Sequence, residues 1–175
     1  MSRKICKYFN DVCTLSQDNY YLSGNDSDLG VKNFDKPEAL DFALLESHLV
    51  KLLSGESIMS PDYCFSSHRR LSSKSLVKPN KLILIEGTML LHSKLIEEAA
   101  SCIVYCDIDI DICLLRRLRR DLNERGRRLI DVTNQYLSDV RPGYFKYVYK
   151  YRPKAHFFYN EKNLAELLNK IDILR

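Results

Sequence analysis

Apolar residues along the chain follow two alternating patterns. Short apolar runs are typical of β-strands, and a continuous run such as residues 82–85 is typical of a strand covered on both faces. Stretches in which apolar residues recur every three or four positions are typical of helices packed on one side. The pattern predicts strands at residues 12–16, 82–85, 102–106 and 156–159. It predicts helices at 3–10, from 35 to the glycine at 55, at 93–100, from about 109, at 130–140 and after 160.

Residues that prefer helix ends support these boundaries. Asp35 is a good N-cap for the first long helix, because Pro37 and Glu38 follow in its first turn. Gly55 ends this helix, and Asn160 is the predicted N-cap of the last one. The apolar face of the first long helix is formed by Leu40, Leu44, Leu45, Leu49, Leu52 and Leu53.

Two segments lack a regular apolar pattern. Residues 22–33 are rich in Ser, Asn, Asp and Gly, which predicts a loop. Residues 56–79 are rich in Ser, and we expect them to be irregular.

Strands that alternate with helices predict an α/β fold with a mostly parallel sheet flanked by helices. A length of 175 residues fits one domain, residues 1–175. In such folds ligands bind at the carboxyl ends of the strands. Acidic residues follow three predicted strands at these ends, namely Asp18, Glu86, and Asp107 with Asp109. The order of the elements therefore predicts an active site at this edge of the sheet.

Composition narrows the class of protein. No run approaches the roughly 20 apolar residues that span a bilayer, and no apolar segment for secretion follows the basic N-terminus. The six cysteines form no CxxC pair, so we expect reduced thiols in a cytoplasmic protein without a membrane partner. The formal net charge is only +4, but seven arginines and two acids lie within residues 116–128. This concentration of positive charge favours an anionic partner.

Asp18 and Glu86 are the carboxylates most suited to chemistry. A carboxylate at a strand end could take a proton from a hydroxyl nucleophile or hold Mg²⁺. The arginines would then complete a phosphoryl-transfer site, since that chemistry depends on positioning and charge neutralisation. The alternatives are that the acids are turn or cap residues and that the arginines form a solvated helix face.

Aromatic residues gather in the Ser-rich segment. Tyr63, Phe65 and His68 could form a pocket for a flat ring, with aromatic faces for stacking and an imidazole for hydrogen bonds at the ring edge. The alternative is a loop that these aromatic side chains anchor on the core.

Several segments, in this order, resemble the uridine/cytidine kinase family of P-loop nucleoside kinases, in the phosphoribulokinase/uridine kinase group. The similarity covers nearly the whole chain. The segments that carry it are LSQDNYY from Leu15, NFDKPEALD from Asn33, YCFSSH from Tyr63, IEG from Ile85, RRLRRD from Arg116 with ERGR from Glu124, and the pairs Gln135-Tyr136 and Arg141-Pro142.

The resemblance implies transfer of a phosphoryl group from ATP, with Mg²⁺, to the 5′-hydroxyl of a pyrimidine nucleoside in pyrimidine salvage. Asp18 would be the base, Glu86 would serve the metal, and residues 116–128 would form a lid over the phosphates. The substrate-binding residues implied are Tyr21, Phe34, Asp35, Tyr63, Phe65, His68, Arg117, Arg127 and Gln135. Arg120 and Arg125 would contact the nucleotide phosphates. The partners implied are the nucleoside, ATP and further copies of the chain.

The chain departs from the family pattern in three places. Cys64 stands where an Asp is common between Tyr63 and Phe65, and Lys36 replaces the usual His before Pro37. The phosphate-binding loop G-x-x-x-x-G-K-[ST] is absent, since no Gly is followed by Lys. We therefore expect the first central strand of the sheet to be missing, as in a truncated gene model or a shortened paralogue.

Three functions remain under comparison. The first is the nucleoside kinase itself. The second is a non-catalytic family member that binds nucleoside or a full-length kinase subunit. The third, a basic RNA-binding module, is disfavoured because the arginine stretch lacks interleaved aromatic residues, so we expect no nucleic-acid partner.

Overall fold

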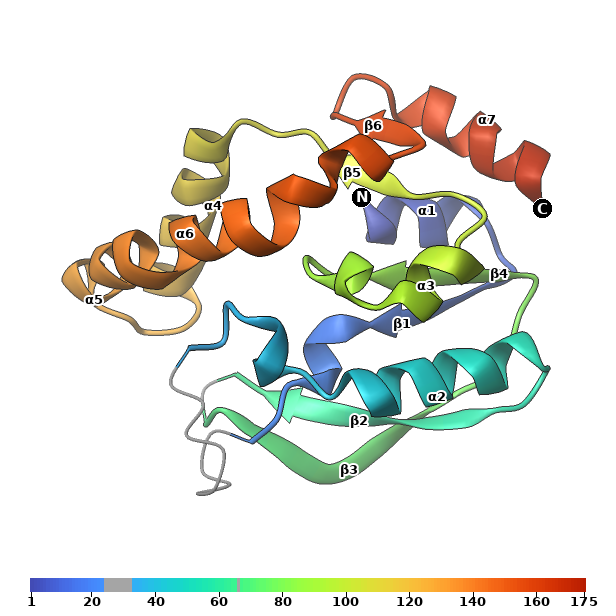
Figure 1. The fold of residues 1–175 in the computed structure, drawn as a ribbon, viewed down its shortest axis with the longest axis horizontal. Helices are drawn as coiled ribbons and strands as arrows, with labels where there is room; N and C mark the ends of the chain where they lie inside the picture. Colours follow the sequence, from blue (N-terminus) through green and yellow to red (C-terminus); the bar gives the residue numbers. More distant parts are fainter. Residues whose placement is uncertain (24–32, 66) are drawn as a thin grey trace.

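Parallel strand pairs lie at the centre of the computed structural model, which describes residues 1–23, 33–65 and 67–175 (Figure 1). β1 (Val12–Ser16) pairs in parallel with β4 (Leu82–Glu86), and β5 (Val104–Cys106) pairs in parallel with β6 (Phe157–Tyr159). The chain therefore has the predicted α/β fold. The predicted loop at 22–33 lies mostly outside the described residues.

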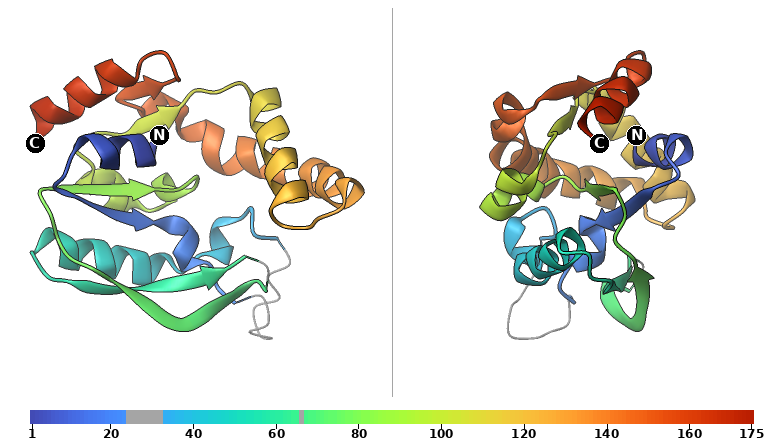
Figure 2. Two further views of the ribbon diagram at one scale, coloured as in Figure 1. Left: turned by 180° about the vertical axis from the view of Figure 1, so that it is seen from behind. Right: turned by 90° about the vertical axis from the view of Figure 1, so that its right-hand side faces the viewer.

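Helices cover these strand pairs in two hydrophobic clusters (Figure 2). α2 (Phe42–Leu53) and α3 (Lys94–Ala99) pack in the first cluster with β1. α1 (Ser2–Tyr8) and α7 (Leu164–Leu174) pack in the second, against β6 and the partly buried Leu82 and Leu84 of β4. Of the apolar face predicted for the first long helix, Leu45, Leu49 and Leu52 are in the core, whereas Leu53 is exposed and Leu40 lies before the helix.

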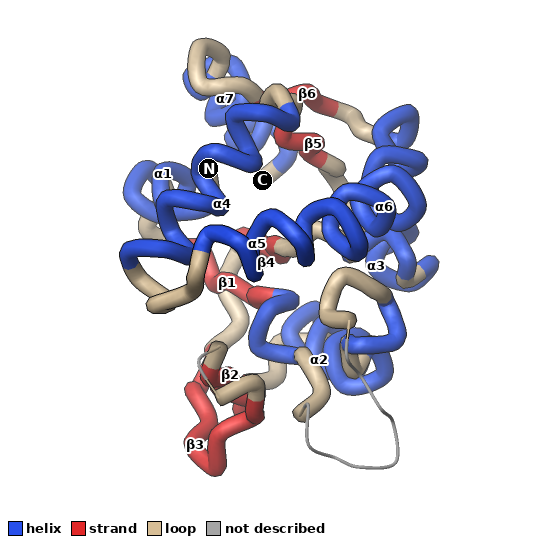
Figure 3. Tube along the Cα trace, turned by 90° about the vertical axis from the view of Figure 1, so that its left-hand side faces the viewer, coloured by secondary structure: helices blue, strands red, loops and turns tan. Residues whose placement is uncertain are grey.

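An arm of helices extends beyond the carboxyl ends of β1 and β4 (Figure 3). It begins with α4 (Ile110–Asn123) and α5 (Leu129–Gln135), and it returns through α6 (Arg141–Gly143) and helical turns that end at Lys154. The arginine-rich segment, residues 116–128, lies on α4 and in the turn that leads from α4 to α5. This places the arginines on the side of the molecule toward which β1 and β4 point.

The segment 56–79 is a β-hairpin, so the prediction of an irregular segment was wrong. β2 (Ile58–Cys64) pairs in antiparallel fashion with β3 (Arg69–Val77), with an irregularity between Pro61 and Tyr63. Most of β3 is exposed, so its serines and lysines face water and no apolar alternation marks it as a strand.

Two predicted helix caps were also wrong. α2 begins at Phe42, because the Asp41 side chain accepts a hydrogen bond from the N–H of Leu44, whereas Asp35 lies upstream of a separate 3₁₀ turn. The last helix has Asn163 as its N-cap, three residues after Asn160. In both places a second Asp or Asn competes for the same role, and the local pattern does not distinguish them.

β4 and β5 are less buried than their continuous apolar runs predict. Every residue of β4 is partly exposed, as are Val104 and Tyr105 of β5. Among the described strands β4 pairs with β1 alone and β5 with β6 alone, so each has one unpaired edge. None of the described helices is long and apolar enough to cross a membrane.

Candidate active site at the carboxyl ends of β1 and β4

Asp18 and Glu86 lie at the ends of neighbouring strands. The β1–β4 register pairs Ser16 with Glu86, and Asp18 follows in a 3₁₀ turn, Gln17–Tyr20. Gly87 passes so close to Gln17 that a Cβ there would lie 2.4 Å from the Gln17 Cβ, so the chain needs glycine directly after Glu86. Parallel pairing thus brings the two predicted carboxylates to one edge of the sheet.

The Asp18 carboxyl has a perturbed pKa. Its side chain reaches solvent, but the surrounding protein reduces its hydration, and this burial raises the pKa above its usual value. The negative charge of Glu86 raises it further, whereas Arg125 and Arg120 lower it. Two predicted lid arginines therefore act electrostatically on the predicted base.

Arg70 holds the turn that carries Asp18, a role that sequence reasoning missed. Its guanidinium donates to the carbonyls of Tyr20 and Tyr21, both at 2.9 Å, and pairs with the Asp41 carboxylate at 3.1 Å. The Tyr20 hydroxyl lies 2.7 Å from Nδ1 of His48 on α2. The hairpin and α2 thus fix the backbone on both sides of the turn.

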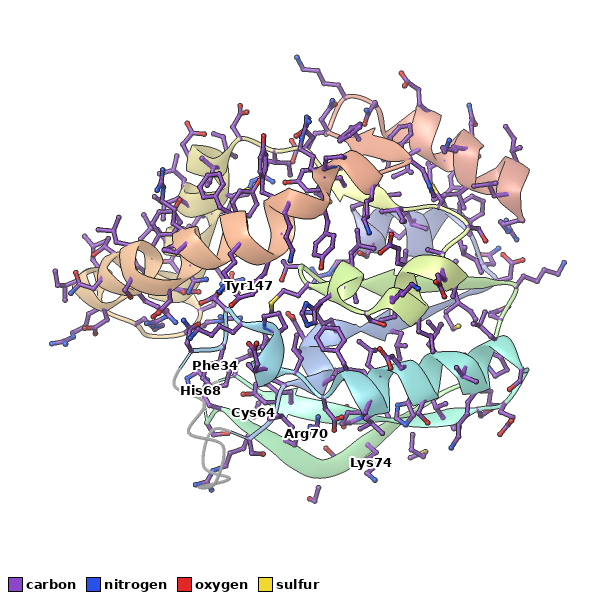
Figure 4. All side chains as sticks on the ribbon, viewed as in Figure 1. Phe34, Cys64, His68, Arg70, Lys74 and Tyr147 are labelled. Atoms are coloured by element: carbon purple, nitrogen blue, oxygen red, sulfur yellow. The ribbon has the colours of Figure 1, made fainter. Side chains whose placement is uncertain are left out.

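Five aromatic side chains form one cluster beside this turn. The Phe34 and His68 rings are stacked, with centroids 4.9 Å apart and planes at 16° (Figure 4). Tyr21 contacts Phe34 and Tyr63, and Tyr63 contacts Phe65, at centroid distances of 5.2–5.8 Å. The structure therefore brings together every aromatic residue predicted to surround the substrate.

Asp35 lies between the aromatic cluster and the helical arm. Burial raises its pKa, Arg117 and Arg127 lower it, and Asp139 raises it. Its backbone carbonyl would lie 2.7 Å from a Cβ at residue 143, so Gly143 of α6 allows the arm to approach.

Four arginines of the arm converge on one buried carboxylate, Asp121, which sequence reasoning had not assigned to the site. Arg117, Arg120, Arg125 and Arg127 each place a nitrogen within 3.6 Å of its oxygens. Gln135 Oε1 accepts hydrogen bonds from two of them, Arg117 at 2.9 Å and Arg127 at 2.7 Å. Asp121 lies four residues after Arg117 and four before Arg125, but Glu124 has the same spacing to Arg120 and Arg128, so spacing alone does not identify it.

The arm also contacts the aromatic cluster. The Arg125 guanidinium carbon lies 4.9 Å from the centroid of the Phe65 ring, a cation–π contact. Other arginines of residues 116–128 bind exposed acids, Arg116 with Glu161 and Arg128 with Asp131. For these two the alternative of a solvated helix face applies.

Asp107 and Asp109 are used elsewhere. Asp107 pairs with Arg152 at 2.9 Å, and Asp109 is the N-cap of α4. Both line a hollow of about 320 Å³ at the carboxyl ends of β5 and β6, with Arg116 and Asn160 among its other walls. Asp18 and Glu86 do not line it.

A metal at the site would need ligands from the substrate. Within the described part of the chain, no group of three His, Cys, Asp or Glu residues is arranged to hold a metal ion. The paired carboxylates Asp18 and Glu86 nevertheless supply the hard oxygen donors that Mg²⁺ prefers, and Mg²⁺ often uses one or two carboxylates together with phosphate oxygens. The residues therefore fit a metal that arrives with a nucleotide.

Comparison with known proteins supports the same grouping. The model of the phosphoribulokinase/uridine kinase family matches residues 18–163. A uridine kinase from Clostridium perfringens is 38% identical over 147 residues, which cover 81% of this chain and 71% of the relative. A uridine kinase from Proteus mirabilis is 38% identical over 141 residues, which cover 79% and 66%.

Solved structures of low identity agree in fold. A protein described as a candidate fructose transport system kinase from Silicibacter sp. TM1040 gives a TM-score of 0.66 at 14% identity, over 85% of this chain and 75% of that one. A possible uridine kinase from Bacillus stearothermophilus gives 0.50 at 18% identity, over 91% and 77%. Because the family model spans most of the sequence and relatives align over most of their length, the chain belongs to the phosphoribulokinase/uridine kinase family.

Proposed function

We propose that the protein acts in pyrimidine salvage by transferring a phosphoryl group from ATP to the 5′-hydroxyl of uridine or cytidine. The observation that carries this proposal is the position of Asp18. Its carboxyl group is electrostatically coupled to Glu86 on one side and to Arg120 and Arg125 on the other, next to an aromatic cluster suited to a flat base. The names of the uridine kinase relatives support the same reaction.

Asp18 would accept the proton of the 5′-hydroxyl. Burial moves the pKa of Asp18 toward neutral pH, and a general base works best when its pKa is near the working pH. As the proton moves to Asp18, the hydroxyl oxygen would attack the terminal phosphorus of ATP, the bond from that phosphorus to the bridging oxygen would break, and ADP would leave. Arg120 and Arg125 would neutralise the charge of the transferring group, which is the main requirement of this chemistry.

The remaining side chains would hold the nucleoside. Asp35 and Arg117 would bind the ribose hydroxyls, with Arg127 and Gln135 alongside. The stacked Phe34 and His68, with Tyr21, Tyr63 and Phe65, would enclose the pyrimidine. Holding the sugar and the base separately would orient the 5′-hydroxyl toward Asp18, which lowers the entropic part of the barrier.

Glu86 and the nucleotide phosphates would hold Mg²⁺. When bound, this ion neutralises phosphate charge and withdraws electrons from the phosphorus. Within the chain, Glu86 contributes its carboxylate from the last position of β4, where pairing with Ser16 fixes the backbone.

A binding role without catalysis is the second candidate. It is favoured by one observation, that none of the glycines in the sequence is followed by Lys. The Gly-Lys-Ser/Thr motif supplies backbone N–H groups, a lysine and a hydroxyl to the ATP phosphates. Without it, the chain would bind nucleoside while binding ATP poorly.

One pair of assays distinguishes the candidates. The purified chain is tested for transfer of labelled phosphate from ATP to uridine and, by calorimetry, for uridine binding. Transfer that disappears in Asp18→Asn while uridine binding persists supports the kinase. Binding without transfer supports the second candidate, and the absence of both contradicts the two proposals.

A further inference from the structure

The two oxygens of Asp121 have different partners. Oδ1 lies 2.9 Å from Arg120 Nη2 and 3.6 Å from Arg125 Nη1. Oδ2 lies 3.6 Å from Arg117 Nε and 3.5 Å from Arg127 Nη1. One carboxylate therefore divides four arginines into two pairs, one pair for each oxygen.

The two pairs act on different parts of the site. The Oδ1 pair, Arg120 and Arg125, consists of the cations that act on Asp18, and Arg125 also lies over Phe65. The Oδ2 pair, Arg117 and Arg127, consists of the cations that act on Asp35, and both donate to Gln135 Oε1. The first pair serves the end where a phosphoryl group would transfer, and the second serves the end that would hold the sugar.

The carboxylate at the centre of this arrangement is buried, whereas the arginines around it are partly exposed. The Asp121 side chain has 0% of its surface exposed, while the four arginine side chains are between 21% and 43% exposed. Four guanidinium groups share this one carboxylate, and two of them also act on Asp18 and two on Asp35. Such cations would repel one another into solvent unless a buried anion held them, and a cluster of cations favours an anionic ligand.

We propose that Asp121 is a positioning residue that sets the spacing between the phosphate-binding pair and the sugar-binding pair of arginines. The roles of the pairs rest on the proposed function, but the positioning of four guanidinium groups around an anion site does not. Asp121 itself would touch no substrate, because its oxygens are occupied by the arginines and shielded from solvent.

The test uses Asp121→Asn, with Asp131→Asn as its matched control. Asp131 is also an acid of the arm paired with an arginine, but it is partly exposed and contacts Arg128 alone among the ion pairs described. Calorimetry measures the affinity of each protein for inorganic pyrophosphate, uridine, 2′-deoxyuridine and uridine monophosphate. Thermal unfolding shows that each variant is folded at the assay temperature.

A change of charge alone and a loss of positioning predict opposite effects of Asp121→Asn on pyrophosphate affinity. Removing a negative charge from a cationic cluster would by itself strengthen anion binding. If Asp121 positions the arginines, Asp121→Asn instead weakens pyrophosphate binding at least about 10-fold relative to Asp131→Asn, because misplaced groups lose affinity steeply. Pyrophosphate binding that is unchanged or tighter in Asp121→Asn overturns the proposal, whether or not the chain binds nucleosides.

Two binding preferences report on the two ends of the site. The preference for uridine monophosphate over uridine reports on the phosphate-binding pair, and the preference for uridine over 2′-deoxyuridine reports on the sugar-binding pair. Asp121→Asn is expected to reduce both preferences. If the wild-type chain binds pyrophosphate but no nucleoside, the proposed function fails while the positioning role is still decided by pyrophosphate. Should Asp121→Asn unfold, Asp121→Glu keeps the charge and shifts the carboxylate by one methylene, and wild-type pyrophosphate affinity in that variant contradicts the proposal.

Discussion

Replacing Arg70 by Met removes the three contacts that fix the turn carrying Asp18 but keeps the length of the side-chain stem. In this variant the Tyr20 carbonyl still accepts a hydrogen bond from the backbone N–H of Asp41, at 2.9 Å in the structure, and the Asp41 side chain still caps α2. The Tyr21 carbonyl loses its guanidinium donor, and the Asp41 carboxylate loses its cation. The backbone between β1 and α2 is therefore expected to loosen without unfolding of the core.

The size of the effect follows from these contacts. Hydrogen bonds to charged groups contribute about 1.5–3 kcal/mol each. The Arg70 and Asp41 side chains are 24% and 26% exposed, so water screens the ion pair, and neighbouring contacts do not add fully. We expect Arg70→Met to lower the free energy of unfolding by about 3 kcal/mol, which corresponds to a fall in Tm of roughly 6–12 °C for a chain of this size.

Urea unfolding followed by circular dichroism measures this loss, with Lys74→Met as the control. Lys74 lies four residues further along the same strand, exposed to solvent, and its replacement is expected to change stability by less than about 0.5 kcal/mol (Figure 4). Uridine affinity is expected to fall in Arg70→Met alone, because Tyr21 and Asp18 shift together. If Arg70→Met lowers the free energy of unfolding by less than about 1 kcal/mol, and by no more than Lys74→Met does, Arg70 does not hold the turn.

Three further outcomes are expected. Because the pKa of Asp18 is raised in the folded state, its stabilising effect is present at low pH and is lost as pH rises through the folded-state pKa, so the ionised carboxylate destabilises the fold. Asp18→Asn is therefore expected to raise Tm relative to the wild-type chain at pH 7 but not at pH 3, and the same Tm difference at both pH values would contradict the shift. His68→Ala removes the ring stacked on Phe34 and is expected to weaken uridine binding about 3–10-fold in calorimetry while leaving pyrophosphate binding unchanged; equal losses would make the ring structural only. Gly143→Ala places a Cβ 2.7 Å from the Asp35 carbonyl, so it should cost about 1–3 kcal/mol in urea unfolding and weaken uridine binding, whereas wild-type values for both would show that the arm yields without strain.

The hairpin shows why one part of the fold could not be predicted. A strand is recognisable in sequence when one of its faces is buried, since apolar and polar residues then alternate. β3 is exposed along most of its length, so its residues carry little of that signal. It pairs with β2, and its contribution to the candidate site is Arg70, whose partners Tyr20, Tyr21 and Asp41 lie far away in the sequence.

The candidate site divides in the same way. The acids at the strand ends could be predicted because they directly follow clear apolar runs. Tyr63, Phe65 and His68 could be predicted because they lie close together in one segment, whereas Tyr21 and Phe34 were implied only by the family resemblance. Asp121 could not be assigned, because it is one of two acids in an arginine-rich segment, and only its complete burial distinguishes it from the exposed Glu124. Burial depends on how α4 and α5 pack, which no local pattern encodes.

The amino-acid order alone determined that acidic residues lie at or just after the ends of β1 and β4 and that arginines concentrate in one later segment, because side-chain periodicity is a property of neighbours in the chain. Only the tertiary structure decided which arginines share Asp121, which of them act on Asp18 and which on Asp35, and that Arg70 holds the turn. The physical reason is that Coulombic and hydrogen-bond energies depend on distances of a few ångströms between residues that are remote in sequence, and these distances are set by the packing of whole elements.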